Sequence, residues 1–322
     1  MIEFVDVRKS YGTVRALDGV SFRIRRGEVF GFIGPNGAGK TTSIKILTGM
    51  IRAYEGSVLI EGTPLEDERA SFHRRVGYLP QTAGFQEWRT VRHALTTFGR
   101  LSGLVHPDLD RRIAAVSRRL GLSESLDRKI VHLSGGMQQR LRFAQAILHE
   151  PEVVILDEPL SGLDPSSRAE LKRTIRELAS EDHTIVLTSH VLSDVEDLAT
   201  RIAIIDRGSI RDSGTREELR DRHNVAMLVE ILGTAIHGHT DAFATLAAVA
   251  RVVPIGTGAS ADGPGARLER LILEIEPHAV IDDALQEIMQ TIVSRRVPVR
   301  SVRHLQPSLE DVYLSLTEAS RE

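Results

Sequence analysis

The sequence predicts an α/β domain of about 220 residues followed by a smaller α+β domain. Up to about residue 220, short apolar runs alternate with helix-spaced apolar positions, which is typical of strands alternating with helices. The length of 322 residues also suggests two domains, because a domain commonly holds roughly 150 residues. The charged stretch Arg216–Arg222 then gives way to an apolar run. We therefore place the first domain at residues 1–221 and the second at residues 225–322.

The composition excludes several classes of protein. Hydrophobic residues make up 41% and charged residues 26%, enough to build a packed core and too balanced for a disordered chain. The chain has no cysteine, which excludes disulfide frameworks, iron–sulfur clusters and a cysteine nucleophile. A net charge of −3 argues against a nucleic-acid partner held by bulk positive charge. No apolar run approaches the ~18 residues of a membrane span, and the N-terminus is acidic, so we expect a cytoplasmic chain.

The elements expected in the first domain follow the hydrophobic pattern in chain order. Two strands bracket a turn, an apolar strand runs into a glycine-rich turn, and a helix follows it. A charge-rich helical insertion comes next, and then two β-branched runs typical of buried parallel strands. We expect these elements at residues 2–7, 20–24, 29–33, 42–50, about 90–146, 153–156 and 184–188.

The second domain has a different order of predicted strands and helices. Its pattern reads strand, helix, strand, a loop rich in Gly, Ala and Asp, then strand, helix, strand and a closing helix. We expect these elements at residues 225–231, 240–250, 252–255, 256–265, 268–275, 281–294, 298–302 and 308–317. This βαββαβ order fits a small ferredoxin-like α+β layer.

The segment Gly34–Thr41 matches the P-loop pattern in full, with an apolar strand before it and a helix after it. Its glycines let backbone N–H groups converge on phosphate oxygens, and the helix N-terminus adds positive partial charge. Lys40 can reach the β- and γ-phosphates, and the Thr41 hydroxyl suits a Mg²⁺ ligand. The guanine-specific loop Asn-Lys-x-Asp is missing, because neither Asn36 nor Asn224 precedes a lysine. The pattern therefore favours an ATP-dependent protein over a GTPase.

Two acidic residues end the apolar run Val153–Leu156. A buried strand holds such carboxylates at the carboxyl edge of the sheet, where ligands of α/β proteins bind. Asp157 suits Mg²⁺ binding through water, and Glu158 suits polarisation of an attacking water.

A second anion-binding helix end is predicted at Leu133–Arg140. Ser134 is a typical N-cap residue, and Gly135 and Gly136 open the helix behind it. One chain thus carries two separate phosphate-binding ends.

Together these motifs resemble the nucleotide-binding subunit of ATP-binding cassette (ABC) transporters, over residues 1 to about 220. The resemblance implies a P-loop ABC ATPase cassette with a RecA-like core, an antiparallel β subdomain and a helical subdomain at about 82–150. It implies that ATP and Mg²⁺ are the cofactors, and that the smaller domain is an accessory domain.

The resemblance also implies roles for individual residues. Tyr11 would stack on adenine, and Gln81 would touch Mg²⁺ and sense the membrane partner. Asp164 ends a loop that crosses the dimer interface, and His190 would contact the γ-phosphate beside the catalytic Glu158. The remaining nucleotide-contacting positions are Asn36, Gly37, Gly39, Thr42, Ser134, Gly135, Gly136 and Gln138.

The partners implied by the resemblance are integral-membrane permease subunits and a second ATPase subunit arranged head to tail. The chain would then lie peripherally on the inner face of the cell membrane. The ending Gln306–Leu314 resembles the close of drug- and antibiotic-resistance exporter ATPases. An importer ATPase with a regulatory domain stays open as an alternative, and a soluble ABC ATPase is a further one. The run Trp88–His93 departs from the exporter pattern at the surface that receives the permease, so the resemblance does not identify the cargo.

Two features of the second domain invite functional interpretation. His237 and His239 could suggest a metal, but no third ligand lies nearby in sequence, and we expect a solvated loop. The closing helix carries an apolar stripe, Leu309, Val312, Tyr313 and Leu316, that needs a partner surface. We expect this domain to act in assembly or regulation.

Overall fold

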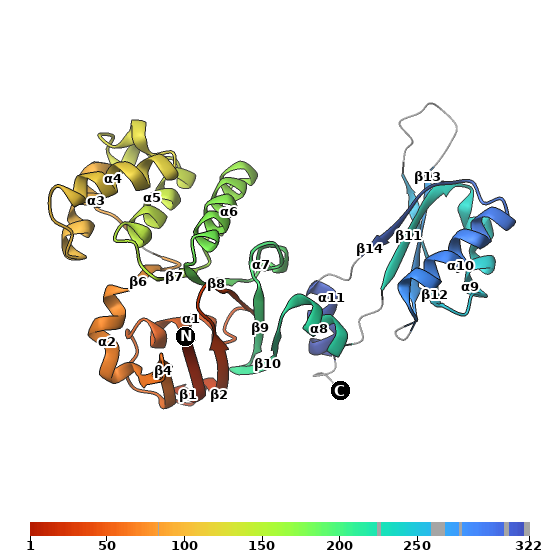
Figure 1. Cartoon of the computed structure of the whole chain (residues 1–322), viewed down its shortest axis with the longest axis horizontal. Helices are drawn as coiled ribbons and strands as arrows, with labels where there is room; N and C mark the ends of the chain where they lie inside the picture. Colours follow the sequence, from red (N-terminus) through yellow and green to blue (C-terminus); the bar gives the residue numbers. More distant parts are fainter. Residues whose placement is uncertain (83, 224–226, 259–267, 277–278, 306–308, 319–322) are drawn as a thin grey trace. The chain divides into compact units, whose positions relative to one another are not determined.

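The computed structural model describes residues 1–82, 84–223, 227–258, 268–276, 279–305 and 309–318. The chain divides into two compact units, Met1–Arg216 and Glu217–Glu322 (Figure 1). Each unit has its own buried apolar cluster.

An antiparallel sheet covers one side of the first unit. Its strand order is β2 (Val14–Ile24), β1 (Ile2–Tyr11), β4 (Glu55–Ile60) and β5 (Thr63–Pro64). The ring of Phe22 lies 4.4 Å from Phe4 and 5.2 Å from Phe30, centroid to centroid. Because Phe30 belongs to the central sheet, these stacked rings join the two sheets through a shared core.

The central sheet positions the functional loops. Its order is β10 (Ser209–Gly214), β9 (Arg201–Asp206), β3 (Val29–Ile33), β8 (Thr184–Ser189), β7 (Val153–Asp157) and β6 (Val76–Leu79). The pairs from β9 to β6 are parallel, and β10 is antiparallel. Strands β3 and β8 are buried along their whole length, as expected for parallel strands covered on both faces. The carboxyl ends of β3, β7 and β8 therefore meet at one edge.

Helices fill the connections of this sheet. Helices α1 (Lys40–Leu47), α6 (Pro165–Ser180) and α7 (Leu192–Leu198) follow β3, β7 and β8, and α2 (Leu65–Arg74) precedes β6. Three further helices lie between β6 and β7 and form the separate group in Figure 1: α3 (Val91–Leu101), α4 (Asp108–Arg119) and α5 (Gly135–Ile147). This group lies where the sequence predicts a helical insertion.

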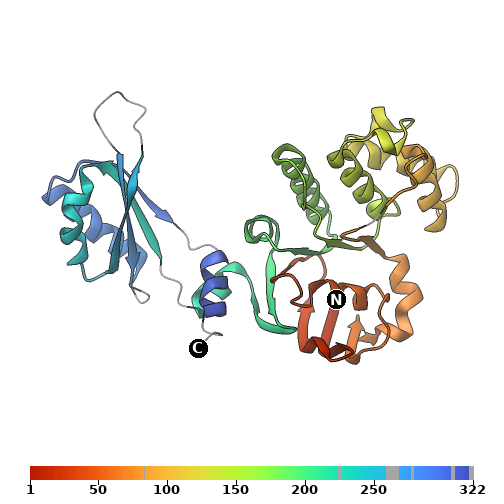
Figure 2. The same ribbon diagram turned by 180° about the vertical axis from the view of Figure 1, so that it is seen from behind.

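The second unit contains a four-stranded antiparallel sheet of order β12-β13-β11-β14. Its elements are α8 (Arg216–Arg222), β11 (Leu228–Thr234), α9 (Thr240–Ala244), β12 (Val249–Gly258), β13 (Leu268–Ile275), α10 (Ile281–Ser294), β14 (Val299–Leu305) and α11 (Leu309–Glu318). Helix α10 and the strand β13 keep the bounds expected from the sequence. Helices α9 and α10 lie beside this sheet, and the view from behind in Figure 2 shows the same arrangement.

Several element bounds expected from the sequence need correction. The helix expected at 42–50 is α1, and the strands expected at 252–255 and 298–302 are the longer β12 and β14. The helix expected at 240–250 ends at Ala244, because Val249 already pairs with Ile275 in the sheet. The expected strands 2–7 and 20–24 are both longer, since they form one extended hairpin. In α11, Leu309 and Val312 have no exposed surface, so this part of the predicted apolar stripe is buried within the chain. Parts of the expected strand 225–231, loop 256–265 and helix 308–317 lie outside the described residues.

Candidate functional site

The P-loop is shaped by glycines between β3 and α1. A Cβ on Gly34 would lie 2.1 Å from the Ile205 carbonyl oxygen, so no side chain fits there. Gly37 and Gly39 adopt φ values of 83° and 115°, which favour glycine. The loop can therefore turn tightly and aim backbone N–H groups at an anion.

Lys40 lies at the start of α1 and is 6% exposed. Its ammonium donates hydrogen bonds to the carbonyl oxygens of Gly34, at 2.6 Å, and Pro35, at 3.2 Å. Burial lowers the pKa of Lys40, while the charges of Glu158 and Asp157 act against that shift. The ammonium is thus held within the P-loop, where a phosphate could replace the carbonyl contacts.

The two acids at the end of β7 are joined to β8 by one threonine. The Glu158 N–H donates to Thr188 Oγ1 at 2.9 Å, and the Thr188 hydroxyl donates to Asp157 Oδ1 at 2.7 Å. Asp157 is 1% exposed, and its Oδ2 has no hydrogen-bond partner among the described residues. A buried carboxylate oxygen without a donor is a suitable ligand for a hard cation such as Mg²⁺.

Glu158 and His190 form a close pair at the same edge. The carboxylate Oε2 lies 2.8 Å from His190 Nδ1. The Glu158 side chain is nearly buried, whereas the His190 side chain is 48% exposed. Glu158 also has φ 54°, a left-handed conformation that is unfavourable for a residue with a side chain. The carboxylate that lines the cavity thus belongs to a residue with a strained backbone.

A cavity of about 280 Å³ lies over the P-loop. Its lining brings together residues predicted separately: Asn36, Gly37, Gly39, Lys40, Thr41, Thr42, Gln81 and Glu158. Basic, hydroxyl and acidic groups thus converge in one place, as a phosphate and a divalent cation would require.

Other predicted residues lie elsewhere on the described chain. Tyr11, at the end of the β1–β2 hairpin, does not line this cavity, and its ring lies 5.1 Å from the Lys9 ammonium. Ser134 caps α5 by accepting a hydrogen bond from the Met137 N–H at 3.3 Å. Asp164 caps α6 and accepts two backbone N–H bonds at 3.0 Å, which lower the pKa of its carboxyl group.

The N-terminal end of α5 lies at the surface of the chain. Ser134 and Gly135 are exposed, Gly136 and Gln138 are half-buried, and none of these residues is in the P-loop cavity lining. A Cβ on Gly136 would lie 2.5 Å from Ser167 Oγ, whereas one on Gly135 would meet nothing within 4 Å. Gly136 thus allows close packing of α5 on α6, and Gly135 keeps the surface open.

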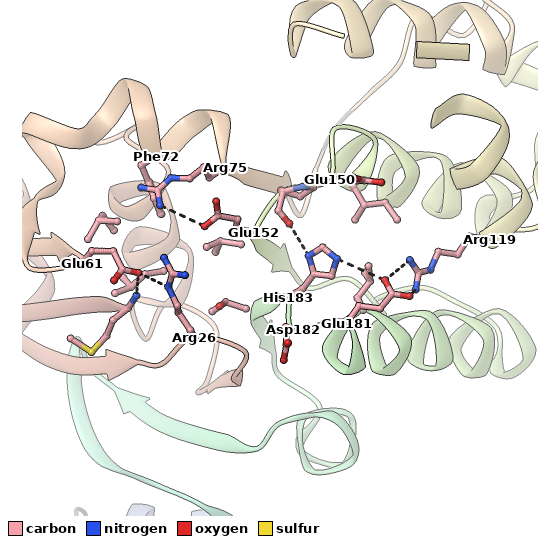
Figure 3. Close-up of a pocket in the computed structure, with 18 residues that line it drawn as sticks. Arg26, Glu61, Phe72, Arg75, Arg119, Glu150, Glu152, Glu181, Asp182 and His183 are labelled. Carbon is pink, nitrogen blue, oxygen red and sulfur yellow. Dashed lines mark hydrogen bonds and ion pairs between the residues drawn. The ribbon is translucent and has the colours of Figure 1, made fainter. Parts of the chain in front are cut away.

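A larger cavity, about 440 Å³, lies at the opposite edge of the sheet, by the first residues of β7 and β8 (Figure 3). Paired charges line it: Arg26–Glu61 at 2.9 Å, Arg75–Glu152 at 3.6 Å and Arg119–Glu181 at 2.7 Å. None of the predicted site residues lines it, and most of its charged side chains are held in ion pairs. The smaller cavity is therefore the one that brings the predicted site residues together.

Sequence reasoning missed two buried linking residues. Thr188, with no exposed surface, holds both acids, and Gln139 donates to the Pro159 carbonyl oxygen at 2.7 Å. The signal for Thr188 was its position as a hydroxyl residue near the end of a buried strand. Gln139 gave no local signal, because its bond joins α5 to the loop after β7.

The described residues contain no group of three or more His, Asp or Glu that could hold a metal by themselves. His237 instead contacts neighbouring backbone and charge: its backbone N–H donates to Glu269 Oε2 at 2.7 Å, and its Nε2 lies 3.1 Å from the Arg270 carbonyl oxygen. Among the described helices, none has the length and apolar character of a membrane span.

Comparison with known proteins decides the family. The model of the ABC transporter family matches residues 17–161. The linearmycin resistance ATP-binding protein LnrL of Bacillus subtilis is 30% identical over 318 residues, 98% of each chain. This chain is an ATP-binding protein of the ABC transporter family.

Other relatives of this ABC ATPase agree. The daunorubicin resistance ATP-binding protein DrrA3 of Streptomyces coeruleorubidus is 32% identical over 97% of this chain and 94% of its own. A solved ATP-binding subunit of an ABC transporter is 31% identical, with a TM-score of 0.63 over 69% of this chain and 92% of that one. The dimeric cassette MJ0796 is 23% identical, with a TM-score of 0.62 over 67% of this chain and 98% of that one, which shows the shared fold. The cassette fold expected from the sequence is thus confirmed.

Proposed function

We propose that this ABC ATPase powers an exporter of antibiotic-like compounds through separate membrane permease subunits. The observation that carries the proposal is the similarity to LnrL over 98% of both chains, which includes the second unit. With a permease as partner, the chain would lie peripherally on the inner face of the cell membrane. An importer ATPase is the competing proposal, because importer ATPases with a ferredoxin-like regulatory domain would share the sheet order of the second unit.

We propose that ATP binds in the P-loop cavity with its phosphates on the loop N–H groups and Lys40. Thr41 and Asp157, with Gln81, would hold Mg²⁺, which neutralises phosphate charge when bound. Glu158 would orient and polarise the attacking water, and His190, 2.8 Å from that carboxylate, would contact the γ-phosphate.

We further propose a head-to-tail dimer. Ser134 and Gly135 are exposed at the α5 end, and Asp164 is exposed at the α6 end, as segments that reach a partner's nucleotide would be. In this arrangement Ser134, Gly135, Gly136 and Gln138 of one chain complete the P-loop cavity of the other. Tyr11 is proposed to stack on adenine, because it is exposed at the end of the hairpin.

The permease surface is proposed to include Trp88. This side chain is 65% exposed, and the Arg89 guanidinium lies 4.9 Å from its ring. An exposed aromatic residue beside an arginine is typical of an interface anchor. We expect Trp88→Ala to reduce copurification with the permease and to leave the ATP affinity of the isolated chain unchanged.

For the second unit we propose a ferredoxin-like accessory domain at residues 225–322, after a nucleotide-binding domain at 1–221. The antiparallel order β12-β13-β11-β14, with α9 and α10 in the crossovers, supports this assignment.

The decisive experiment uses Glu158→Gln, which keeps shape but removes the carboxylate. With ATP and Mg²⁺, the variant should bind nucleotide, stop hydrolysis and double its mass in light scattering. Glu181→Gln, in the ion-paired cavity at the opposite edge, is the matched control and should hydrolyse ATP like wild type. Full ATP hydrolysis by Glu158→Gln would contradict the assigned site. Transport by vesicles that contain the permease, measured in both directions, separates export from import.

A further inference from the structure

A cluster of charges around the buried Asp194 joins α6 to α7, and none of its residues lines the P-loop cavity. Lys172 Nζ on α6 lies 2.9 Å from Asp194 Oδ1 and 2.6 Å from Asp197 Oδ2, both on α7. Arg168 Nη1 lies 3.7 Å from the same Asp194 oxygen. We call these four residues the α6–α7 ion cluster. None of them has a place in the proposed mechanism.

Asp194 is the buried member of this cluster, and its burial makes the ion pairs between α6 and α7 necessary. The residue is 2% exposed, so its carboxylate depends on the two α6 cations for compensation. Burial lowers the pKa of Lys172, but its hydrogen bond to Asp197 and the nearby Asp194 carboxylate raise it by more, so Lys172 stays charged. A buried charge pair with defined geometry resists sliding or rotation, since displacement would leave Asp194 unpaired. The cluster thus fixes α7 relative to α6.

The cluster lies about one helical turn from the loop that ends at Asp164, on the α6 side, and about one turn from the loop that contains His190, on the α7 side. On α6, the Arg168 N–H donates to the Asp164 carbonyl oxygen at 2.9 Å. On α7, Asp194 follows His190 by four residues, and its N–H donates to the Val191 carbonyl oxygen at 3.2 Å. The Asp164 loop is exposed, and His190 contacts Glu158. A short rigid path therefore runs from an exposed loop to the catalytic carboxylate.

We propose that Lys172 and Asp194 are positioning residues that hold the His190 loop in register with the Asp164 loop. The inference rests on the proposed function, which gives these two loops their roles. None of the cluster residues lines the P-loop cavity, so the cluster would act through the placement of His190. Contact of a second chain with the Asp164 loop would be transmitted through α6 to the cluster and on to His190.

The test compares Lys172→Met, which removes the charge and keeps the length, with Lys172→Arg, which keeps the charge. Asp197→Asn is the matched control: it removes a contact to the same lysine, but from a half-exposed side chain. Hydrogen exchange of the full chain, with and without ATP, is followed at residues 161–164 and 189–192. Steady-state kinetics are normalised to the number of ATP-binding sites, so that loss of folded protein does not lower kcat.

We expect Lys172→Met to raise exchange in both loops and to lower kcat about tenfold, with KM little changed, because misplacement of about 1 Å can cost roughly 10²-fold in rate. Lys172→Arg should restore both properties. Asp197→Asn should behave like wild type, since exposed ion pairs contribute little. If Lys172→Met does not fold, Asp194→Asn, which keeps the side-chain volume, is assessed by the same criteria.

Three results would overturn the proposal: wild-type exchange and kcat in Lys172→Met, increased exchange confined to α7 itself, or an equal effect of Asp197→Asn. Hydrogen exchange needs no turnover, so it tests the cluster even without hydrolysis. Wild-type hydrolysis reports separately on the proposed function.

Discussion

Thr188 offers the sharpest test of how the fold holds the two acids. Valine has nearly the same shape as threonine but lacks the hydroxyl that accepts from the Glu158 N–H and donates to Asp157. Thr188 has no exposed surface, so water cannot replace those bonds without rearrangement. Thr188→Val therefore leaves two buried polar groups without their partner, and Asp157 already has one oxygen unpaired.

The expected magnitude follows from those two bonds. A buried group left unsatisfied costs about 1–3 kcal/mol, so the pair should cost roughly 2–6 kcal/mol of unfolding free energy. For a unit of this size, about 2 kcal/mol corresponds to a fall in Tm of at least about 4 °C. Turnover should fall as well, because the Glu158 backbone loses the contact that fixes it.

Scanning calorimetry of the full chain measures the Tm of the first unit. Thr188→Ser keeps the hydroxyl and should lie close to wild type. Thr174→Val is a second control, since this buried hydroxyl donates to the Glu170 carbonyl oxygen one turn earlier in α6 and links no other element among the described residues. If Thr188→Val has the same Tm as Thr188→Ser, the two hydrogen bonds do not stabilise the fold and the reasoning is wrong.

Three further outcomes are expected. Lys40→Ala should weaken ATP binding by about 1.5–3 kcal/mol, the contribution of a charge-assisted bond, and unchanged affinity by titration calorimetry would place the phosphates elsewhere. Gly31→Ala puts a Cβ 2.1 Å from a side chain of α7, so the denaturation midpoint should fall clearly, whereas Gly84→Ala meets nothing within 4 Å and should be neutral. Burial lowers the pKa of His149, because the buried site disfavours the charged imidazole. The neutral His149 therefore contributes to stability above about pH 6.5, and this contribution is lost as the pH falls through the pKa of the folded state. Denaturation midpoints between pH 7.5 and pH 5 should show this loss, and His149→Gln should reduce it without abolishing it, because burial lowers the pKa of His73 too.

The elements predicted correctly are those whose bounds depend on residues that are neighbours in the sequence. The strand at 29–33 has the predicted bounds, because an apolar run leads straight into glycines that must turn. Strand β7 was predicted one residue short, at 153–156, and its last residue, Asp157, was already expected at the carboxyl edge. Helix α10 also matches, since its apolar spacing extends over its whole length.

The parts that sequence could not give depend on contacts between distant segments. The region after Ala244 carries apolar residues compatible with either helix or strand, and the pairing of Val249 with Ile275 decides for strand. Thr188 became a linking residue only when β7 and β8 lay side by side. The burial of Leu309 and Val312 likewise depends on tertiary packing, which an amphipathic pattern cannot specify.

The left-handed backbone at Glu158 has a consequence for any laboratory evolution of this ATPase. A residue with a side chain held at φ 54° costs roughly 1–2 kcal/mol, and glycine would relieve that cost. A screen that rewards only thermal tolerance or expression should therefore enrich Glu158→Gly, and with it chains that bind nucleotide but do not turn it over. Libraries designed to raise the thermal stability of the protein should therefore keep Glu158 unchanged, or include an assay of released phosphate in each round of selection.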